Sequence, residues 1–154
     1  MAVMNPYNYS RPKKFINTNP VTFEPSEKKS ENVIGNRTNQ YLEQKIMAAK
    51  PEELTYMLYD GLVKFIKKAI IQLGNCNYQE VNYNCQRAQS IIDELRSTLN
   101  MDVELSYSLE QLYEYMGYKL VNANVDKDEK QFAEVLKMAE SFKDTWKEAF
   151  NIKG

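Results

Sequence analysis

The side chains best suited to chemistry in this sequence are two thiols, Cys76 and Cys85, which stand nine residues apart. On or beside one helix, two such positions point in different directions and do not easily form a disulfide. The chain has no Cys-x-x-Cys pair and no histidine, which argues against His-based catalysis and against most zinc and di-iron sites. We therefore expect two free thiols in a reducing compartment, with no metal and no other cofactor.

The remaining polar residues do not form a catalytic pattern. The sequence contains no Gly-rich phosphate loop and no G-x-S-x-G turn. Its carboxylates are spread along the chain, and Glu43, Glu52 and Glu53 suit helix N-termini better than acid–base chemistry. By elimination we expect no catalytic residue, and the protein is predicted not to be an enzyme.

The charge of the chain does not indicate a particular class of partner. The formal net charge is -1, so there is no general attraction to nucleic acid or to an anionic membrane. The pairs Lys13–Lys14 and Lys28–Lys29 are too sparse for a nucleic-acid-binding arm. A third group, Lys64, Lys67 and Lys68, forms either a solvated helix edge or a contact for an acidic partner.

Hydropathy indicates the compartment. No apolar run approaches the roughly 20 residues of a membrane helix, and no apolar stretch near the N-terminus resembles a signal peptide. We therefore expect a cytoplasmic protein that does not insert into membranes.

Residues 1–40 differ from the rest of the chain. They hold four of the five prolines, six basic and three acidic residues, and many Asn, Ser and Thr residues, without a sustained helical or strand period. Such a composition is typical of segments that cannot bury enough apolar surface to fold. We predict a mostly disordered, flexible tail over residues 1–40 and one helical domain over residues 41–154.

Apolar residues at steps of three and four predict helices from about residue 41. A short helical segment over Tyr41–Ala49 precedes four longer helices, expected at Pro51–Leu73, Tyr78–Leu99, Leu105–Val125 and Glu129–Asn151. A proline suits the first turn of a helix, where its missing N–H costs nothing. Four long helices joined by short links predict an all-α fold, an antiparallel up-and-down four-helix bundle.

The helix that begins at Pro51 carries more apolar surface than a bundle core needs. At 100° per residue, the row expected to face the core is Leu54, Leu58, Gly61, Phe65 and Ala69. A second apolar row falls on a different side of the helix: Tyr56, Tyr59, Val63, Ile66 and Ile70. The combined arc exceeds half of the circumference, whereas a peripheral bundle helix normally shows a narrower stripe. Something beyond the core should therefore cover the second row.

Three coverings of the second row remain open. They are the chain's own N-terminal segment through Tyr41 and Ile46, a second copy of the chain, and a helix of a partner protein. The first and third are compatible if the segment is a removable lid over a helix-binding groove. A separate cluster, Tyr113, Tyr115 and Tyr118, either edges the core or belongs to a surface that is covered only at times.

Several segments match one known family in order and in spacing. Pro51–Gly61, with the sequence PEELTYMLYDG, is typical of that family's first long helix, and Tyr41 precedes it at the family's usual distance. Further matches are Asn5–Tyr7, Ala88–Leu95, Leu112–Met116 and Asp144–Ala149. Over about residues 41–150 the chain resembles the FliS family of flagellin-specific export chaperones. It differs from that family by about 30 extra residues between Tyr7 and Tyr41.

The resemblance implies a function without chemistry. It implies that the protein binds the C-terminal region of newly made flagellin in the cytosol, prevents premature polymerisation and assists delivery to the flagellar type III export gate. The residues expected to contact flagellin are Tyr56, Tyr59, Val63, Ile66 and Ile70. Tyr41 and Ile46 are expected to form the lid, and the family's counterpart of Tyr41 is also linked to the export gate.

The oligomeric state separates this function from its alternative. The chaperone hypothesis predicts a monomer or weak homodimer that forms a 1:1 complex. The alternative is a structural or adaptor bundle whose surplus apolar face forms a homodimer or binds another export component.

Overall fold

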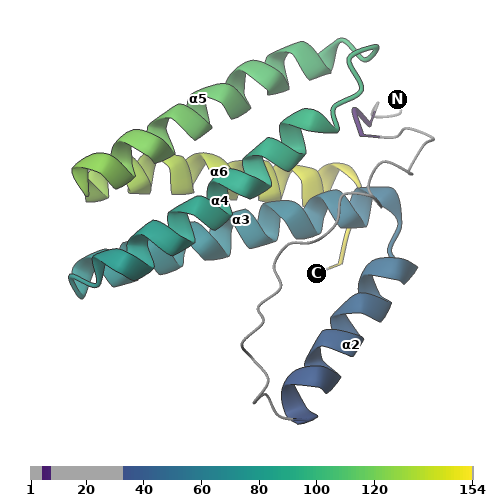
Figure 1. Cartoon of the computed structure of the whole chain (residues 1–154). Helices are drawn as coiled ribbons and strands as arrows, with labels where there is room; N and C mark the ends of the chain where they lie inside the picture. Colours follow the sequence, from purple (N-terminus) through teal and green to yellow (C-terminus); the bar gives the residue numbers. More distant parts are fainter. Residues whose placement is uncertain (1–4, 8–32, 154) are drawn as a thin grey trace.

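A computed structural model of the chain describes residues 5–7 and 33–153, with the side chains of residues 33–39 and 41 excepted. In these ranges the chain is helical and has no strand. The helices, in chain order (Figure 1), are α2 (Val33–Ala48), α3 (Pro51–Gly74), α4 (Tyr78–Ser97), α5 (Leu105–Asp126) and α6 (Glu129–Ala149).

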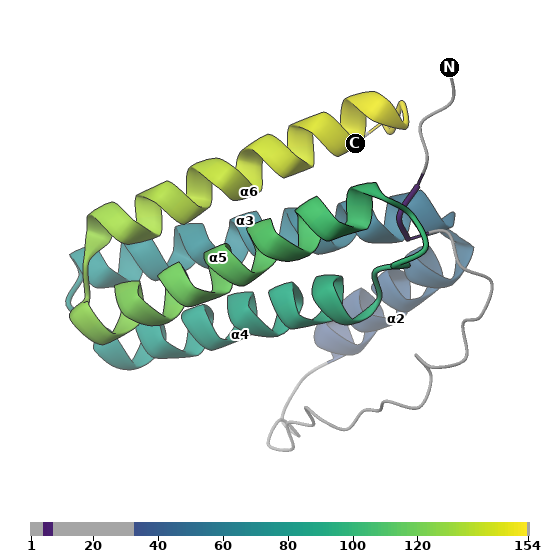
Figure 2. The same cartoon turned by 90° about the horizontal axis from the view of Figure 1, so that it is seen from above.

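Four of these helices form the bundle. α3 packs against α4 and α6, and α5 packs against the same two helices, so α3 and α5 are diagonal to each other. Successive helices are joined by short links and run in opposite directions (Figure 2). The predicted all-α fold is confirmed, and these contacts are those of an up-and-down bundle.

Local sequence signals set the helix ends. Pro51 occupies the first turn of α3, and the Glu53 carboxylate accepts from the Lys50 backbone N–H at 3.1 Å. At α6 the Asp128 carboxylate accepts from the Lys130 backbone N–H at 3.0 Å, which satisfies one of the free N–H groups of the first turn. After α5, Lys127 adopts a left-handed conformation with φ of 50° and reverses the chain toward α6.

The N-terminal helix is longer than the sequence indicated. α2 begins at Val33, eight residues before the expected boundary at Tyr41, so the predicted tail over 1–40 is partly helical. Once a helix is nucleated, each added residue gains one hydrogen bond, and extension into weakly favourable sequence is therefore inexpensive. The rest of the predicted tail, residues 8–32, lies outside the described residues.

The two apolar rows of α3 have exchanged roles relative to the sequence-based expectation. Tyr59, Val63 and Ile66, expected on an open face, are buried in the bundle core. Most of the row expected in the core is only partly buried: Leu54, Leu58, Gly61 and Phe65. The periodicity located both rows correctly, but it carries no information about which row lies between the neighbouring helices.

A short segment from the far N-terminus completes one end of the bundle. The backbone oxygen of the buried Pro6 accepts from the Asn100 backbone N–H at 2.8 Å, in the link between α4 and α5. The Tyr7 ring meets the Trp146 ring edge-on, with centroids 5.9 Å apart. The Tyr7 hydroxyl lies 2.8 Å from the Leu95 backbone oxygen. Residues 5–7 therefore join α4 and α6.

Three tyrosine hydroxyls form one hydrogen-bonded chain. The Tyr7 and Tyr113 oxygens are 2.9 Å apart, and the Tyr113 and Tyr59 oxygens are 2.5 Å apart. A phenol has one proton, and a carbonyl can only accept. If Tyr7 donates to Leu95, then Tyr113 donates to Tyr7 and Tyr59 donates to Tyr113, so every proton has an acceptor. Burial without such partners would cost free energy.

We expect Tyr7→Phe to lower the free energy of unfolding by about 1–2 kcal/mol, because one buried hydroxyl proton loses its acceptor. Urea unfolding followed by circular dichroism measures the change. Tyr107→Phe is the matched control, since Tyr107 is 60% exposed and should tolerate the change. Equal stability of the Tyr7→Phe and wild-type proteins would contradict a role for this hydroxyl chain.

A second prediction concerns alkaline pH. Burial, reinforced by the neighbouring phenols, raises the pKa of Tyr59 and of Tyr113 above the ordinary value of 10.0. The neutral phenols thus stabilise the fold fully below pH of about 10, and this contribution is lost as the pH rises further. We expect the last phenols to ionise only together with loss of helix, as followed by phenolate absorbance and circular dichroism. Ionisation of all eleven tyrosines in an intact bundle would show the prediction to be wrong.

Candidate partner-binding surface

The described residues do not assemble a reactive centre. The Cys85 thiol is buried between α4 and α5 and donates to the Leu120 backbone oxygen at 3.4 Å. Burial raises the pKa of this thiol to about 11, against smaller opposing effects of Lys127 and Gln89. Cys76 is exposed. No group of three or more His, Cys, Asp or Glu side chains within the described ranges could hold a metal ion.

The ion pairs tie helices together. Asp60 on α3 lies 3.1 Å from Lys64 of its own helix and 2.9 Å from Lys143 of α6. Partial burial opposes ionisation, but the hydrogen bonds from these two lysines lower the pKa of Asp60 below its ordinary range. Arg96 of α4 donates to both carboxylate oxygens of Glu110 on α5 and joins these two helices in the same way. The Asp60 and Glu110 carboxylates therefore hold neighbouring helices together.

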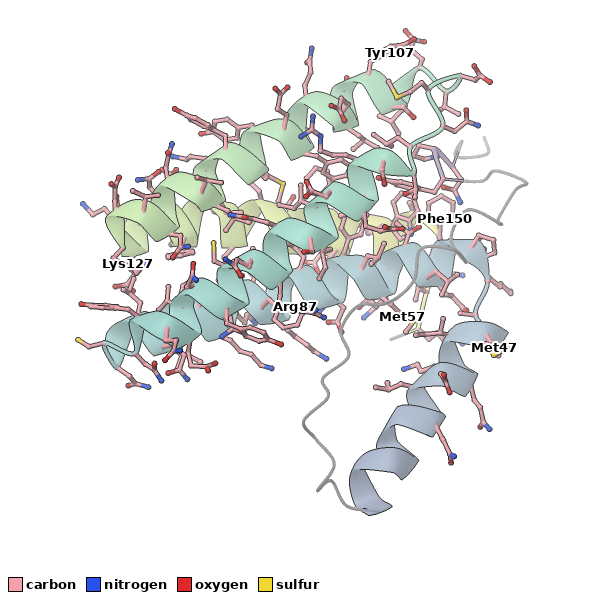
Figure 3. The ribbon with its side chains drawn as sticks, viewed as in Figure 1. Met47, Met57, Arg87, Tyr107, Lys127 and Phe150 are labelled. Atoms are coloured by element: carbon pink, nitrogen blue, oxygen red, sulfur yellow. The ribbon has the colours of Figure 1, made fainter. Side chains whose placement is uncertain are left out.

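The most unusual surface of the described chain is α5. Its core stripe includes Leu109, Tyr113, Met116, Leu120 and Ala123. Half of the fourteen exposed large hydrophobic residues also belong to this helix: Leu105, Tyr107, Leu112, Tyr115, Tyr118, Val121 and Val125. Figure 3 shows Tyr107 at the start of α5, projecting away from the bundle. α5 is therefore apolar on most of its circumference, which is not expected of a helix that only packs into a core.

An apolar groove runs between α5 and α6. It has a volume of about 650 Å³ and is lined by Leu112, Tyr115, Glu134, Lys137, Met138, Ser141, Phe142 and Thr145. Phe142, at its floor, stacks on the buried Tyr59 ring with centroids 5.6 Å apart and touches the Tyr113 ring at 5.5 Å. The groove floor thus rests on the hydroxyl-linked tyrosines of the core.

Charged side chains border the groove. Lys119 of α5 forms an ion pair with Glu134 of α6, and its ammonium group lies 5.8 Å from the centre of the Tyr115 ring. The hydrogen bond to Glu134 raises the pKa of Lys119. An apolar trough with a charged border is the geometry that receives one face of an amphipathic helix.

The residues predicted from sequence to contact a partner are only partly accessible. Tyr59, Val63 and Ile66 are buried, so the expectation that they form an open face is wrong. α3 lies between α4 and α6, and the row that faces both neighbours becomes core. Tyr56 and Ile70 are partly buried at the edge of that core. Whether these five residues contact a partner remains a prediction.

The predicted lid residues lie on α2. The Tyr41 side chain is outside the described residues, while Ile46 is 46% exposed. Figure 3 shows Met47 of α2 away from the bundle, whereas Met57 and Arg87 lie on α3 and α4. In this conformation α2 projects from the bundle, and the Ile46 side chain covers little of the bundle surface.

Sequence periodicity missed the α5 surface, although a signal was present. Tyr115 and Tyr118 are exposed and Tyr113 is fully buried, so the tyrosine cluster contributes both to the core and to an open surface. A count of apolar residues around α5, of the kind made for α3, would have shown the surplus.

None of the described helices has the length and apolar character needed to cross a membrane.

Comparisons with known proteins agree on one family. Residues 34–153 match the family described as "Flagellar protein FliS". The chain is 41% identical over 116 residues to the flagellar secretion chaperone FliS of Bacillus subtilis (strain 168), which covers 75% of this chain and 87% of that protein.

More distant relatives carry the same description. The flagellar secretion chaperone FliS of Escherichia coli (strain K12) is 31% identical over 70% of this chain and 82% of its own length. The FliS of Campylobacter jejuni is 27% identical over 73% of this chain and 90% of its own length.

The environments of the thiols predict different reactivity. In the native protein we expect a thiol-specific maleimide to modify Cys76 rapidly and Cys85 only after unfolding, because the thiolate is the reactive form and burial disfavours it. Intact-mass spectrometry should show one label per native chain. A Cys76→Ser variant should take up none before denaturant is added, and rapid labelling of that variant would contradict the buried position of Cys85.

Proposed function

Because the chain belongs to the FliS family of flagellar secretion chaperones, which are not enzymes, we propose that it binds the C-terminal segment of flagellin along α5 and α6. In this proposal the bound segment cannot polymerise prematurely, and the complex is delivered to the flagellar type III export apparatus. The proposed compartment is the cytoplasm, and the proposed free state is a monomer or weak homodimer.

The observation that carries the binding site is the apolar surplus of α5. Seven large apolar side chains are exposed on one helix, beside a groove of about 650 Å³. Two of these side chains, Leu112 and Tyr115, line the groove, and exposed apolar surface beyond what the core needs normally marks an interaction site. An amphipathic segment that lies along the groove would bury Leu112 and Tyr115 together with its own apolar face.

The α5 surface is also suited to releasing the bound segment. A segment that is disordered when free must be ordered on binding, which costs several kcal/mol of the gross interaction free energy. Tyrosine tolerates both burial and water, so Tyr115 and Tyr118 can be covered and uncovered without a large penalty. Such a surface supports moderate affinity, as a chaperone that must hand over its partner requires.

The residues predicted from sequence have places in this proposal. Tyr56 and Ile70 are partly exposed on α3 and could extend the contact. Tyr59 supports the groove floor through Phe142, while Val63 and Ile66 fill the core beside it. The contact with an export gate component is placed on α2, where Ile46 is exposed.

Calorimetric titration with a peptide of the cognate flagellin's C-terminal helical region tests the proposal. We expect saturable 1:1 binding with a negative heat-capacity change. The double variant Leu112→Glu/Tyr115→Glu should weaken binding about tenfold or more, because it places charge on the apolar contact. Leu112 and Tyr115 are 40% and 48% exposed, so the fold should persist.

Ile71→Glu is the matched control, since Ile71 is 60% exposed on α3 and away from the groove. It should bind as the wild-type protein does. An unchanged affinity in the double variant would move the site away from α5. No binding by the wild-type protein, together with a stable dimer that the double variant disrupts, would support the structural alternative, in which α5 joins two copies of the chain.

A further inference from the structure

The outward side of α5 carries a second row of residues at coiled-coil spacing. We call it the outer row, and its members are Tyr107, Gln111, Glu114, Tyr118, Val121 and Val125, all of them exposed. Successive members are alternately four and three residues apart, which is the spacing by which two helices pack along a common seam. At 100° per residue, the outer row points about 150° away from the buried row of the same helix.

The neighbouring helix α6 shows that this outward side is unusual. α6 has nine charged side chains among its 21 residues, and none of the exposed large hydrophobic residues of the described chain belongs to it. α5 has only four charged side chains among 22 residues: Glu110, Glu114, Lys119 and Asp126. Two of these, Glu110 and Lys119, already form ion pairs with neighbouring helices. A face with so little charge and so much apolar surface indicates an interaction site.

The outer row is distinct from the α5–α6 groove. The α5 residues that line the groove, Leu112 and Tyr115, point about 110° away from the outer row. A helix with its side chains is only about 10 Å wide, so one helix seated in the groove does not also lie over the outer row. Within the described chain, α2 projects from the opposite side of the bundle (Figures 1 and 2) and does not cover it. The outer row therefore needs an occupant of its own.

The outer row reads the same from either end, because its steps are four, three, four, three and four. Two copies of α5 can therefore align antiparallel about a twofold axis with all six positions matched. Tyr107 then lies opposite Val125 of the second copy, and Gln111 lies opposite Val121. At the centre, Glu114 lies opposite Tyr118, where a phenol can donate a hydrogen bond to a carboxylate.

We propose that the outer row of α5 joins two copies of this chain in a weak antiparallel homodimer. The row is about 27 Å long, and one helix from each copy makes the contact, so the interface belongs to the small, transient class. Both α5–α6 grooves stay open, since they point away from the second copy. The inference assigns a surface to self-association and stands whether or not flagellin binds in the groove.

The position of Glu114 decides the direction of the pairing. A parallel pair would set Glu114 directly opposite its own counterpart, and opposed like charges are unfavourable. In the antiparallel pair the two carboxylates are offset by four residues, or about 6 Å along the axis, and each faces a phenol.

Polar groups at the centre of the outer row keep the contact weak. The Arg96 guanidinium is bound to Glu110, and the pKa of Arg96 is raised by that hydrogen bond and to a smaller extent by the charge of Glu114. This cation offsets part of the repulsion between the two Glu114 carboxylates. The remaining repulsion and the polar Gln111 lower the affinity but fix the register, as polar residues do in coiled-coil seams.

Sedimentation equilibrium of the full chain, from roughly 10 µM to 1 mM, tests the inference. We expect the mass to rise with concentration from that of one chain toward that of two. Tyr118→Glu should raise the dissociation constant about tenfold or more, because it sets a carboxylate opposite Glu114 twice in the symmetric contact. Tyr118 is 65% exposed, so the circular dichroism spectrum and Tm should stay as in the wild-type protein.

Matched variants test the surface and the register. Tyr83→Glu makes the same change on α4, where Tyr83 is 53% exposed, and should associate as the wild-type protein does. Tyr118→Lys should weaken association less than Tyr118→Glu, since its charge is opposite to that of Glu114. The double variant Glu114→Lys/Tyr118→Glu should recover most of the lost association, because opposite charges face each other again only in the antiparallel register.

The groove variant separates this inference from the flagellin site. Leu112→Glu/Tyr115→Glu should dimerise normally, and Tyr118→Glu should bind the flagellin peptide normally. A failure of peptide binding in the wild-type protein would therefore leave the dimer prediction standing, and a failure to dimerise would leave the groove standing.

Several results would overturn the inference. They are a single monomer mass up to roughly 1 mM, equal effects of Tyr118→Glu and Tyr83→Glu, and no recovery in Glu114→Lys/Tyr118→Glu. A wild-type protein that stays monomeric, together with loss of flagellin-peptide binding in Tyr118→Glu, would reassign the outer row to flagellin.

Discussion

Burying a phenol is favourable only when its hydroxyl has a partner, and the core of this bundle depends on that condition at three connected tyrosines. Tyr59 of α3, Tyr113 of α5 and Tyr7 form a chain of hydroxyls that ends on the Leu95 backbone oxygen of α4. Each link fixes the position of one segment relative to the next. Residues 5–7 thereby help to fix how α3, α4 and α5 are positioned along one another.

The aromatic layer above this chain connects the core to the surface. Phe142 stacks on Tyr59, and Trp146 lies edge-on to Tyr59 and to Tyr7. The Trp146 ring nitrogen also donates to the Glu52 backbone oxygen at 2.9 Å, which ties α6 to the first turn of α3. Because Phe142 forms the groove floor, the shape of the apolar surface on α5 and α6 follows from the packing of the buried tyrosines.

The bundle therefore presents two different faces from one small core. Along α5 the surface is apolar, with seven exposed large side chains. At the α3–α4 seam, the Lys68 ammonium and the Arg87 guanidinium lie near the Phe65 ring. A four-helix bundle allows this division because each helix contributes one stripe to the core and leaves its other sides free to differ.

The sequence by itself determined the helices of the bundle and the family, because these follow from local signals: apolar periodicity, Pro51 at a helix start, and segments such as Pro51–Gly61. Only the tertiary structure decided that Tyr59 and Ile66 are core, that Tyr118 is exposed and that Tyr7 closes the bundle end. Periodicity shows that a helix has apolar faces, whereas long-range packing decides what covers each one.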